Sequence, residues 1–66
     1  MKKMYEINGL NAARLVFNYR GSQIVANFQG GNRQLGRNAR LVTSNILVQE
    51  AIEHDPRFGT SIRQVG

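Results

Sequence analysis

The chain has 66 residues, with nine Lys and Arg against four Asp and Glu, and it contains no Cys and one His. This length allows a single domain, residues 1–66, and a domain of this size buries only about 60% of its unfolded surface. Disulfides, thiolate metal sites and His clusters are excluded as stabilisers of so small a core. We therefore expect no metal and no cofactor, and we expect a partner chain to supply the missing stability.

The net charge of +5 is unevenly distributed along the chain. Between Glu6 and Glu50 there is no acidic residue, and the remaining three acids, Glu50, Glu53 and Asp55, form an acidic knob. Such a balance favours polyanions or acidic protein surfaces as partners. Arg outnumbers Lys, and its planar, bidentate group suits interfaces better than simple solubility.

Apolar residues come only in short runs. The longest, such as residues 15–17 and 46–48, have three residues, whereas a membrane helix needs ~20 and a signal-peptide core ~7. We expect no membrane partner, and the lack of Cys fits a reducing cytoplasm.

The first part of the chain predicts strands. Residues 3–7 form a short run that the turn signal Asn8-Gly9 ends. Residues 14–20 and 23–28 alternate in polarity, and Gly21 lies between them, which is typical of an antiparallel hairpin. The residues predicted to face inward are Leu15, Phe17, Tyr19, Ile24, Ala26 and Phe28.

Residues 29–38 are rich in Gly and Arg. They contain neither GxxxxGK[ST] nor GxGxxG, so a phosphate cradle is not indicated. We expect a mobile loop or the tip of a long hairpin, and a further strand over residues 39–42. Gly would let this segment run close to another backbone, such as that of a neighbouring subunit.

One short amphipathic helix is predicted near residues 44–54. Three candidate N-caps, Thr43, Ser44 and Asn45, precede it, and Pro56 ends it near His54. The predicted buried face is Leu47, Val48, Ala51 and Ile52, the predicted polar face includes Asn45, Gln49 and Glu53, and Ile46 falls on the polar side as a partner contact. A final strand is predicted over residues 61–65.

The expected fold is therefore α+β: a small antiparallel sheet of about four to five strands with one helix. The expected core is Leu15, Phe17, Ile24, Phe28, Leu41, Leu47, Ile52 and Phe58.

No catalytic residue is predicted. His54 and Asp55 are neighbours in sequence, which does not give the relay geometry of catalysis, and a helix C-terminus explains His54. The candidate partner-binding residues are Arg14, Arg20, Arg33, Arg37, Arg40, Ile46, Glu50 and Glu53. Glu50 and Glu53 are interpreted as a solvated helix face or, alternatively, as a patch that meets the Arg-rich face of a neighbouring copy.

Residues 39–45, 48–53 and 56–62 together resemble short structural proteins of tailed bacteriophages, especially the crAss-like phages of gut bacteria. In those proteins a strand ends in Thr-Ser-Asn, a helix carries Gln-Glu-Ala-Ile-Glu, and an aromatic-Gly turn leads to the last strand. The segment Phe28-Gln29-Gly30-Gly31 is similar to their strand-end-plus-glycine step. The resemblance covers most of residues 24–62 and implies a virion component, such as an auxiliary or decoration protein bound to the capsid lattice.

We therefore expect a non-enzymatic structural protein that binds and stabilises a larger protein assembly, located in a virion or in the host cytoplasm before assembly. Its partners would be the capsid lattice or neighbouring copies of itself, with no small-molecule substrate. The alternative is a small basic nucleic-acid-binding protein, although RNP-like runs, GXXG clamps and helix-turn-helix pairs are not found.

Overall fold

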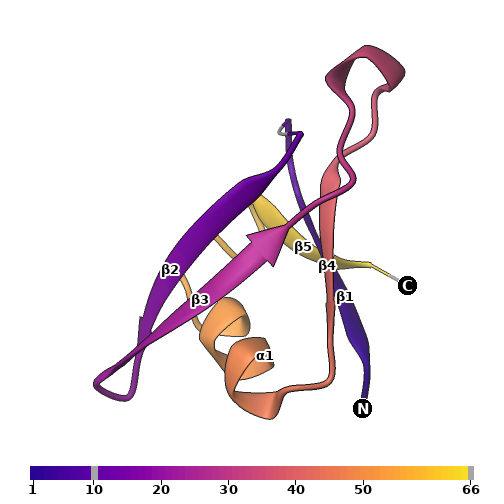
Figure 1. The fold of residues 1–66 in the computed structure, drawn as a ribbon. Helices are drawn as coiled ribbons and strands as arrows, with labels where there is room; N and C mark the ends of the chain where they lie inside the picture. Colours follow the sequence, from indigo (N-terminus) through magenta and orange to yellow (C-terminus); the bar gives the residue numbers. More distant parts are fainter. Residues whose placement is uncertain (10, 66) are drawn as a thin grey trace.

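The computed structural model describes residues 1–9 and 11–65 and has the α+β class that the sequence predicts (Figure 1). The described residues form five strands, one short 3₁₀ helix and one α-helix. Their bounds are β1 Lys3–Ile7, β2 Ala13–Tyr19, β3 Ser22–Phe28, η1 Arg33–Leu35, β4 Ala39–Thr43, α1 Ile46–Glu53 and β5 Ile62–Val65. Each strand lies within about one residue of its predicted position.

β1 is the middle strand of a three-stranded antiparallel sheet, with β4 on one side and β5 on the other. In this register Tyr5 lies opposite Leu41, and Ile7 lies opposite both Ala39 and Ile62. Because side chains alternate along a strand, these residues share one face of the sheet, and that face points into the core.

β2 and β3 form a separate two-stranded hairpin, in which Tyr19 pairs with Ser22. The two residues between them, Arg20 and Gly21, have φ angles of 52° and 74°. Positive φ at both central residues defines the turn that matches the twist of a hairpin. The predicted turn at Gly21 is confirmed, and Arg20 adopts a conformation that a non-glycine residue rarely takes.

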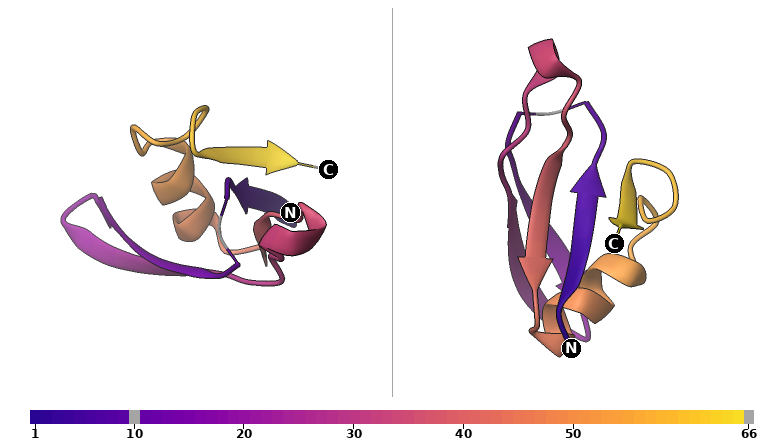
Figure 2. Two further views of the ribbon diagram at one scale, coloured as in Figure 1. Left: turned by 90° about the horizontal axis from the view of Figure 1, so that it is seen from above. Right: turned by 90° about the vertical axis from the view of Figure 1, so that its right-hand side faces the viewer.

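The strands divide between two sheets, where the sequence predicts one. β3 and β4 are consecutive strands, but only one bridge, between Gln29 and Arg40, joins their bases. The two sheets therefore diverge, and α1 occupies the space between them, packed on β2 and β3 (Figure 2).

α1 begins where the capping signal predicts. The Asn45 side-chain oxygen accepts hydrogen bonds from the backbone nitrogens of Leu47 and Val48, at 2.9 and 3.5 Å. This bond pattern satisfies donors that the first helical turn leaves without an intrahelical partner.

The predicted faces of α1 are wrong at two positions. Leu47 is 54% exposed, and Gln49, assigned to the polar face, is only 6% exposed. The reason is that the Gln49 amide donates to the backbone oxygens of Met1 at 2.6 Å and Thr43 at 2.8 Å. These bonds satisfy the buried amide and link the chain start, the end of β4 and the helix, which turns Leu47 outward.

One core is shared by every strand and by α1. Three predicted members, Phe17, Phe28 and Ile52, are fully buried. Four others, Leu15, Ile24, Leu41 and Phe58, are half-buried against the core, and Leu47 is not part of it. The core also contains Tyr5, Ile7, Ala26, Ala39, Ala51 and Ile62.

Candidate functional site

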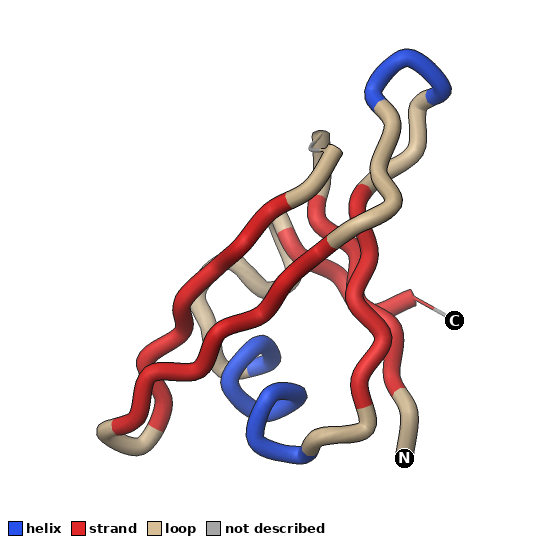
Figure 3. The backbone as a smooth tube through the Cα atoms, in the orientation of Figure 1, coloured by secondary structure: helices blue, strands red, loops and turns tan. Residues whose placement is uncertain are grey.

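Residues 29–38, here called the arm, project from the body as an extension of β3 and β4 (Figures 1 and 3). Beyond the bridge at its base, the two limbs pair once more between Asn32 and Arg37, through two backbone hydrogen bonds of 2.8 Å. The short helix η1 closes the end, and Gly36 leaves it with a left-handed φ of 69°. The Gly- and Arg-rich segment is thus the tip of a long hairpin.

Asparagine side chains fix the shape of the arm. The side chain of Asn32 caps η1 by accepting from the backbone nitrogens of Gln34 and Leu35, at 3.0 and 3.2 Å. Asn11 holds the arm from outside, because its side chain accepts from the backbone nitrogen of Arg33 at 2.9 Å. Neutral hydrogen bonds of this kind specify one conformation without burying apolar surface.

The end of the arm presents an apolar side chain between two cationic ones. Leu35 is 64% exposed, and Arg33 and Arg37 on either side of it are also exposed. None of the η1 residues is buried. The apolar surface of Leu35 is therefore available for contact with another molecule.

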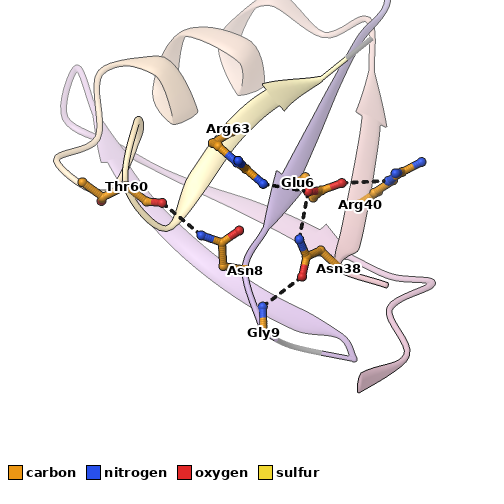
Figure 4. A network of polar contacts seen from close by, with 7 residues as sticks. All are labelled: Glu6, Asn8, Gly9, Asn38, Arg40, Thr60 and Arg63. Atoms are coloured by element: carbon orange, nitrogen blue, oxygen red, sulfur yellow. Dashed lines mark hydrogen bonds and ion pairs between the residues drawn. The ribbon is translucent and has the colours of Figure 1, made fainter. Parts of the chain in front are cut away.

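A polar network lies on the outer face of the three-stranded sheet (Figure 4). At its centre is Glu6 of β1, which is only 7% exposed. Its carboxylate accepts from the Asn38 amide at 2.9 Å, from Arg40 Nε at 3.1 Å and from Arg63 Nη2 at 3.2 Å. The Asn38 side-chain oxygen in turn accepts from the Gly9 nitrogen at 3.1 Å. One carboxylate therefore joins β1, β4, β5 and the base of the arm.

The Asn38 hydrogen bond, followed by those from Arg40 and Arg63, holds the pKa of Glu6 below its usual range. Burial alone would raise that pKa, so the donors outweigh the cost of removing the carboxylate from water. The ionised form of Glu6 is therefore part of the folded structure at neutral pH.

Arg14 and Arg20 lie on β2 and its turn, away from the end of the arm. Arg14 is exposed on the outer side of the hairpin, beside Val16, which is also exposed. The Arg20 guanidinium carbon lies 5.3 Å from the centre of the Tyr19 ring. The turn that carries Arg20 and the arm are at opposite ends of the molecule (Figure 1).

The acidic knob is engaged within the chain. Glu53 accepts a short hydrogen bond from the Tyr5 hydroxyl and one of 2.9 Å from Lys3, and Glu50 accepts from the Tyr19 hydroxyl at 3.2 Å. The hydrogen bonds from Tyr5 and Lys3 lower the pKa of Glu53, and the bond from Tyr5 contributes most. Burial, followed by the interaction with Glu53, raises the pKa of Tyr5.

Asp55 makes two bonds to the Arg57 guanidinium, at 2.8 and 3.1 Å, and these lower its pKa. The same guanidinium lies 4.9 Å from the centre of the Phe17 ring. The acidic knob therefore does not offer a set of unengaged carboxylates to a partner.

Ion pairs among the described residues use four of the nine cationic side chains: Lys3, Arg40, Arg57 and Arg63. The other five have no carboxylate of a described residue within ion-pair distance: Lys2, Arg14, Arg20, Arg33 and Arg37. The positive charge available to a partner is thus carried by the chain start, the hairpin and the arm.

A second exposed apolar area lies at the end of the molecule opposite the arm, where the N-terminus and the start of α1 are found (Figures 1 and 2). Ile46, predicted to be exposed, is 64% exposed. Its neighbour Leu47 and the nearby residues Met1 and Val42 are exposed as well, and the sequence pattern missed these three.

The network around Glu6 was also missed. Alternation along residues 3–7 could have indicated it, because it places Glu6 on the face opposite Tyr5 and Ile7. The Arg63 and Asn38 partners come from distant segments, and no local pattern connects them to Glu6.

In the part of the chain that the structure describes, side chains that could bind a metal or form a catalytic relay do not cluster. Groups of three or more His, Asp and Glu side chains are not found within residues 1–9 and 11–65. His54 stacks on Tyr19 with ring centres 5.4 Å apart. None of the described helices has the length and apolar character needed to cross a membrane.

Comparisons of the chain with models of known protein families, with curated proteins and with solved structures give no match.

Proposed function

We propose that this chain is a non-enzymatic structural protein that binds and stabilises a larger protein assembly through its arm. The observation that carries the proposal is the ordered arm with Leu35 exposed between Arg33 and Arg37. A segment that is already held in one conformation loses little entropy on binding, which favours affinity.

The chemistry of the arm suits a protein surface. An apolar residue flanked by arginines matches the composition of interface centres, where Arg is enriched and contacts exclude water. The exposed apolar area around Ile46 at the opposite end offers a second contact, so one copy can touch two neighbours.

The assembly that we propose is the particle of a tailed phage, with the chain as an auxiliary capsid protein or another virion component. The resemblance of most of residues 24–62 to short phage structural proteins supports this choice. The chain would be found in the virion, or in the host cytoplasm before assembly.

Nucleic-acid binding is the alternative, and the five cations without an internal carboxylate favour it. Against it, all five Phe and Tyr residues are buried or half-buried, so bases have no exposed ring to stack on. The cations also lie at separate ends of the molecule.

The test is incorporation into particles of the phage whose genome encodes the chain, purified on a density gradient and quantified by mass spectrometry. We expect the chain at fixed stoichiometry, and we expect Leu35→Asp to reduce incorporation strongly while Gln34→Ala, in the same turn, leaves it unchanged. Wild-type incorporation of Leu35→Asp would refute the arm as the docking element.

Fluorescence anisotropy with random-sequence DNA tests the alternative. Weak binding at about 150 mM salt is expected. Micromolar binding with a log–log salt slope near −0.9 per neutralised phosphate would favour nucleic acid.

A further inference from the structure

A cavity of about 270 Å³ lies at the base of the arm. It is lined by Gly30, Arg37, Asn38 and Arg40. Among the described residues this lining contains two Arg side chains and one Asn side chain, and neither a carboxylate nor an aromatic or aliphatic side chain. Such a wall is complementary to a small anion rather than to an apolar ligand.

Two of the lining side chains are fixed in place by Glu6. Arg40 donates to it through Nε, at 3.1 Å, which leaves the other N–H groups of a five-donor guanidinium available. Asn38 is held at both ends of its amide, donating to Glu6 at 2.9 Å and accepting from Gly9 at 3.1 Å. The donors on this side of the cavity are therefore positioned before any ligand arrives.

The local charge is positive even with Glu6 included. The guanidiniums of Arg40 and Arg63 both pair with the Glu6 carboxylate, and Arg37, which also lines the cavity, forms no ion pair with a described residue. The Glu6 charge is also shared among three donors, so its field in the cavity is reduced. An anion placed here meets a net attraction that the chain itself does not neutralise.

Gly30 contributes to the wall of the cavity. Its φ of 78° lies in the left-handed region, and a Cβ built there would meet no atom of a described residue within 4 Å. A side chain at this position would be strained by the backbone conformation and would project into open space.

We propose that this cavity binds a carboxylate from an acidic side chain of a protein partner, which Arg37 and Arg40 contact through their planar donor groups. The inference rests on the proposed assembly function and names the chemistry by which the arm recognises its partner. The partner segment would carry an Asp or Glu next to an apolar surface that accepts Leu35.

A protein carboxylate fits these observations better than a nucleic-acid phosphate. Nucleic-acid binding needs a track of cations along the backbone, often with exposed rings for stacking. Here Arg37 and Arg40 line one cavity at the base of the arm, and the turn between β2 and β3, which carries Arg20, lies at the far end of the molecule (Figure 1). The planar fork of N–H donors on a guanidinium matches the two oxygens of one carboxylate.

The experiment is an NMR titration of the ¹⁵N-labelled full chain at constant ionic strength. The probe is a blocked tripeptide, acetyl-Gly-Glu-Gly-amide, and its control is the same peptide with Gln in place of Glu. We expect the Glu peptide to shift the Nε–H signals of Arg37 and Arg40 and the amide signal of Gly30 in a saturable way, and the Gln peptide to shift none of them.

Variants distinguish binding in this cavity from non-specific attraction to the positive charge of the chain. Arg37→Gln should weaken Glu-peptide binding about tenfold, Arg37→Lys should restore only part of it, and Arg20→Gln, which removes the same charge at the far turn, should change it less than about twofold. Arg37 and Arg20 are exposed and outside the core, so the dispersed spectrum of each variant should be retained.

Three results would overturn the proposal: no saturable Glu-peptide binding, equal effects of Arg37→Gln and Arg20→Gln, or tighter binding of inorganic phosphate or a short DNA strand to the same signals. The Leu35 incorporation test does not use this cavity. Loss of incorporation in Leu35→Asp together with no peptide binding would therefore reject the cavity and leave the assembly role standing.

Discussion

In the body of the molecule every strand and α1 give at least one apolar side chain to a common core, whereas the described arm, residues 29–38, has no buried residue. The body is stabilised by removal of apolar surface from water, and the arm by backbone N–H groups that donate to the side-chain oxygens of Asn11, Asn32 and Asn38. The difference teaches that order and burial are separable here. The segment with the least burial also carries a hydrophobic side chain, Leu35, outward, which is where a contact surface is expected.

The largest effect should come from the core. Phe17 is fully buried, so Phe17→Ala should lower the free energy of unfolding by about 3–5 kcal/mol, enough to unfold most molecules of so small a domain. Urea unfolding followed by circular dichroism measures it. A loss below about 1 kcal/mol would mean that the body does not depend on its core as described.

Acid should weaken the body through its carboxylates. The pKa values of Glu6, Glu53 and Asp55 are lowered in the folded state, so the unfolded chain binds more protons at low pH. Stability should be fully present above the unfolded-state pKa of about 4 and should fall as the pH drops through the lower folded values. Glu6→Gln should reduce the difference between urea midpoints measured at neutral and acidic pH, and an unchanged difference would contradict the role of the Glu6 network.

Within the arm, Asn32→Ala should disorder η1 without unfolding the body. The loss of one capping side chain costs about 1 kcal/mol locally, so amide exchange should speed up at Leu35 and Gly36 while the global midpoint stays constant. Gln34→Ala is the matched control, since the Gln34 side chain makes no hydrogen bond with a described residue. A parallel fall in the global midpoint would show that arm and body are one cooperative unit.

The smallest effect should come from the outward side of α1. Leu47→Gln should change the free energy of unfolding by less than about 0.5 kcal/mol, because Leu47 is exposed. Gln49→Ala should cost about 1–3 kcal/mol, because two backbone oxygens lose their donor in a buried place. The reverse order would support the helix face predicted from the sequence pattern.

Local patterns were sufficient for much of this fold. Alternation located β2 and β3, a capping residue located the start of α1, and Gly21 located the hairpin turn. The predicted faces of α1 were wrong at Leu47 and Gln49. The spacing of apolar residues along the helix does not indicate that the Gln49 amide donates to two backbone oxygens. The division into two sheets arises because only one bridge joins the bases of β3 and β4. The alternation of polar and apolar residues along each strand does not reveal which strands pair.

The candidate site was predictable in parts. The Gly- and Arg-rich composition of residues 29–38 located the arm, and helix spacing placed Ile46 outside the core. The hydrogen bonds that Asn11 accepts from Arg33 and Asn38 accepts from Gly9 help to fix the shape of the arm. Their partners are distant in sequence, so only the tertiary structure brings them together. The pairing of the acidic knob with Lys3, Tyr5 and Arg57 likewise required contacts across the fold.

The central place of β1 has a consequence for the order of folding. This first strand pairs with β4 and β5, whose residues leave the ribosome much later. Until residues 62–65 have been synthesised, β1 has at most one neighbouring strand, and at least one of its edges remains unpaired. A chain dominated by such long-range pairings folds slowly for its size. During synthesis its early segments therefore depend on hairpin β2–β3, whose strands are close in sequence, as the first structure that can form.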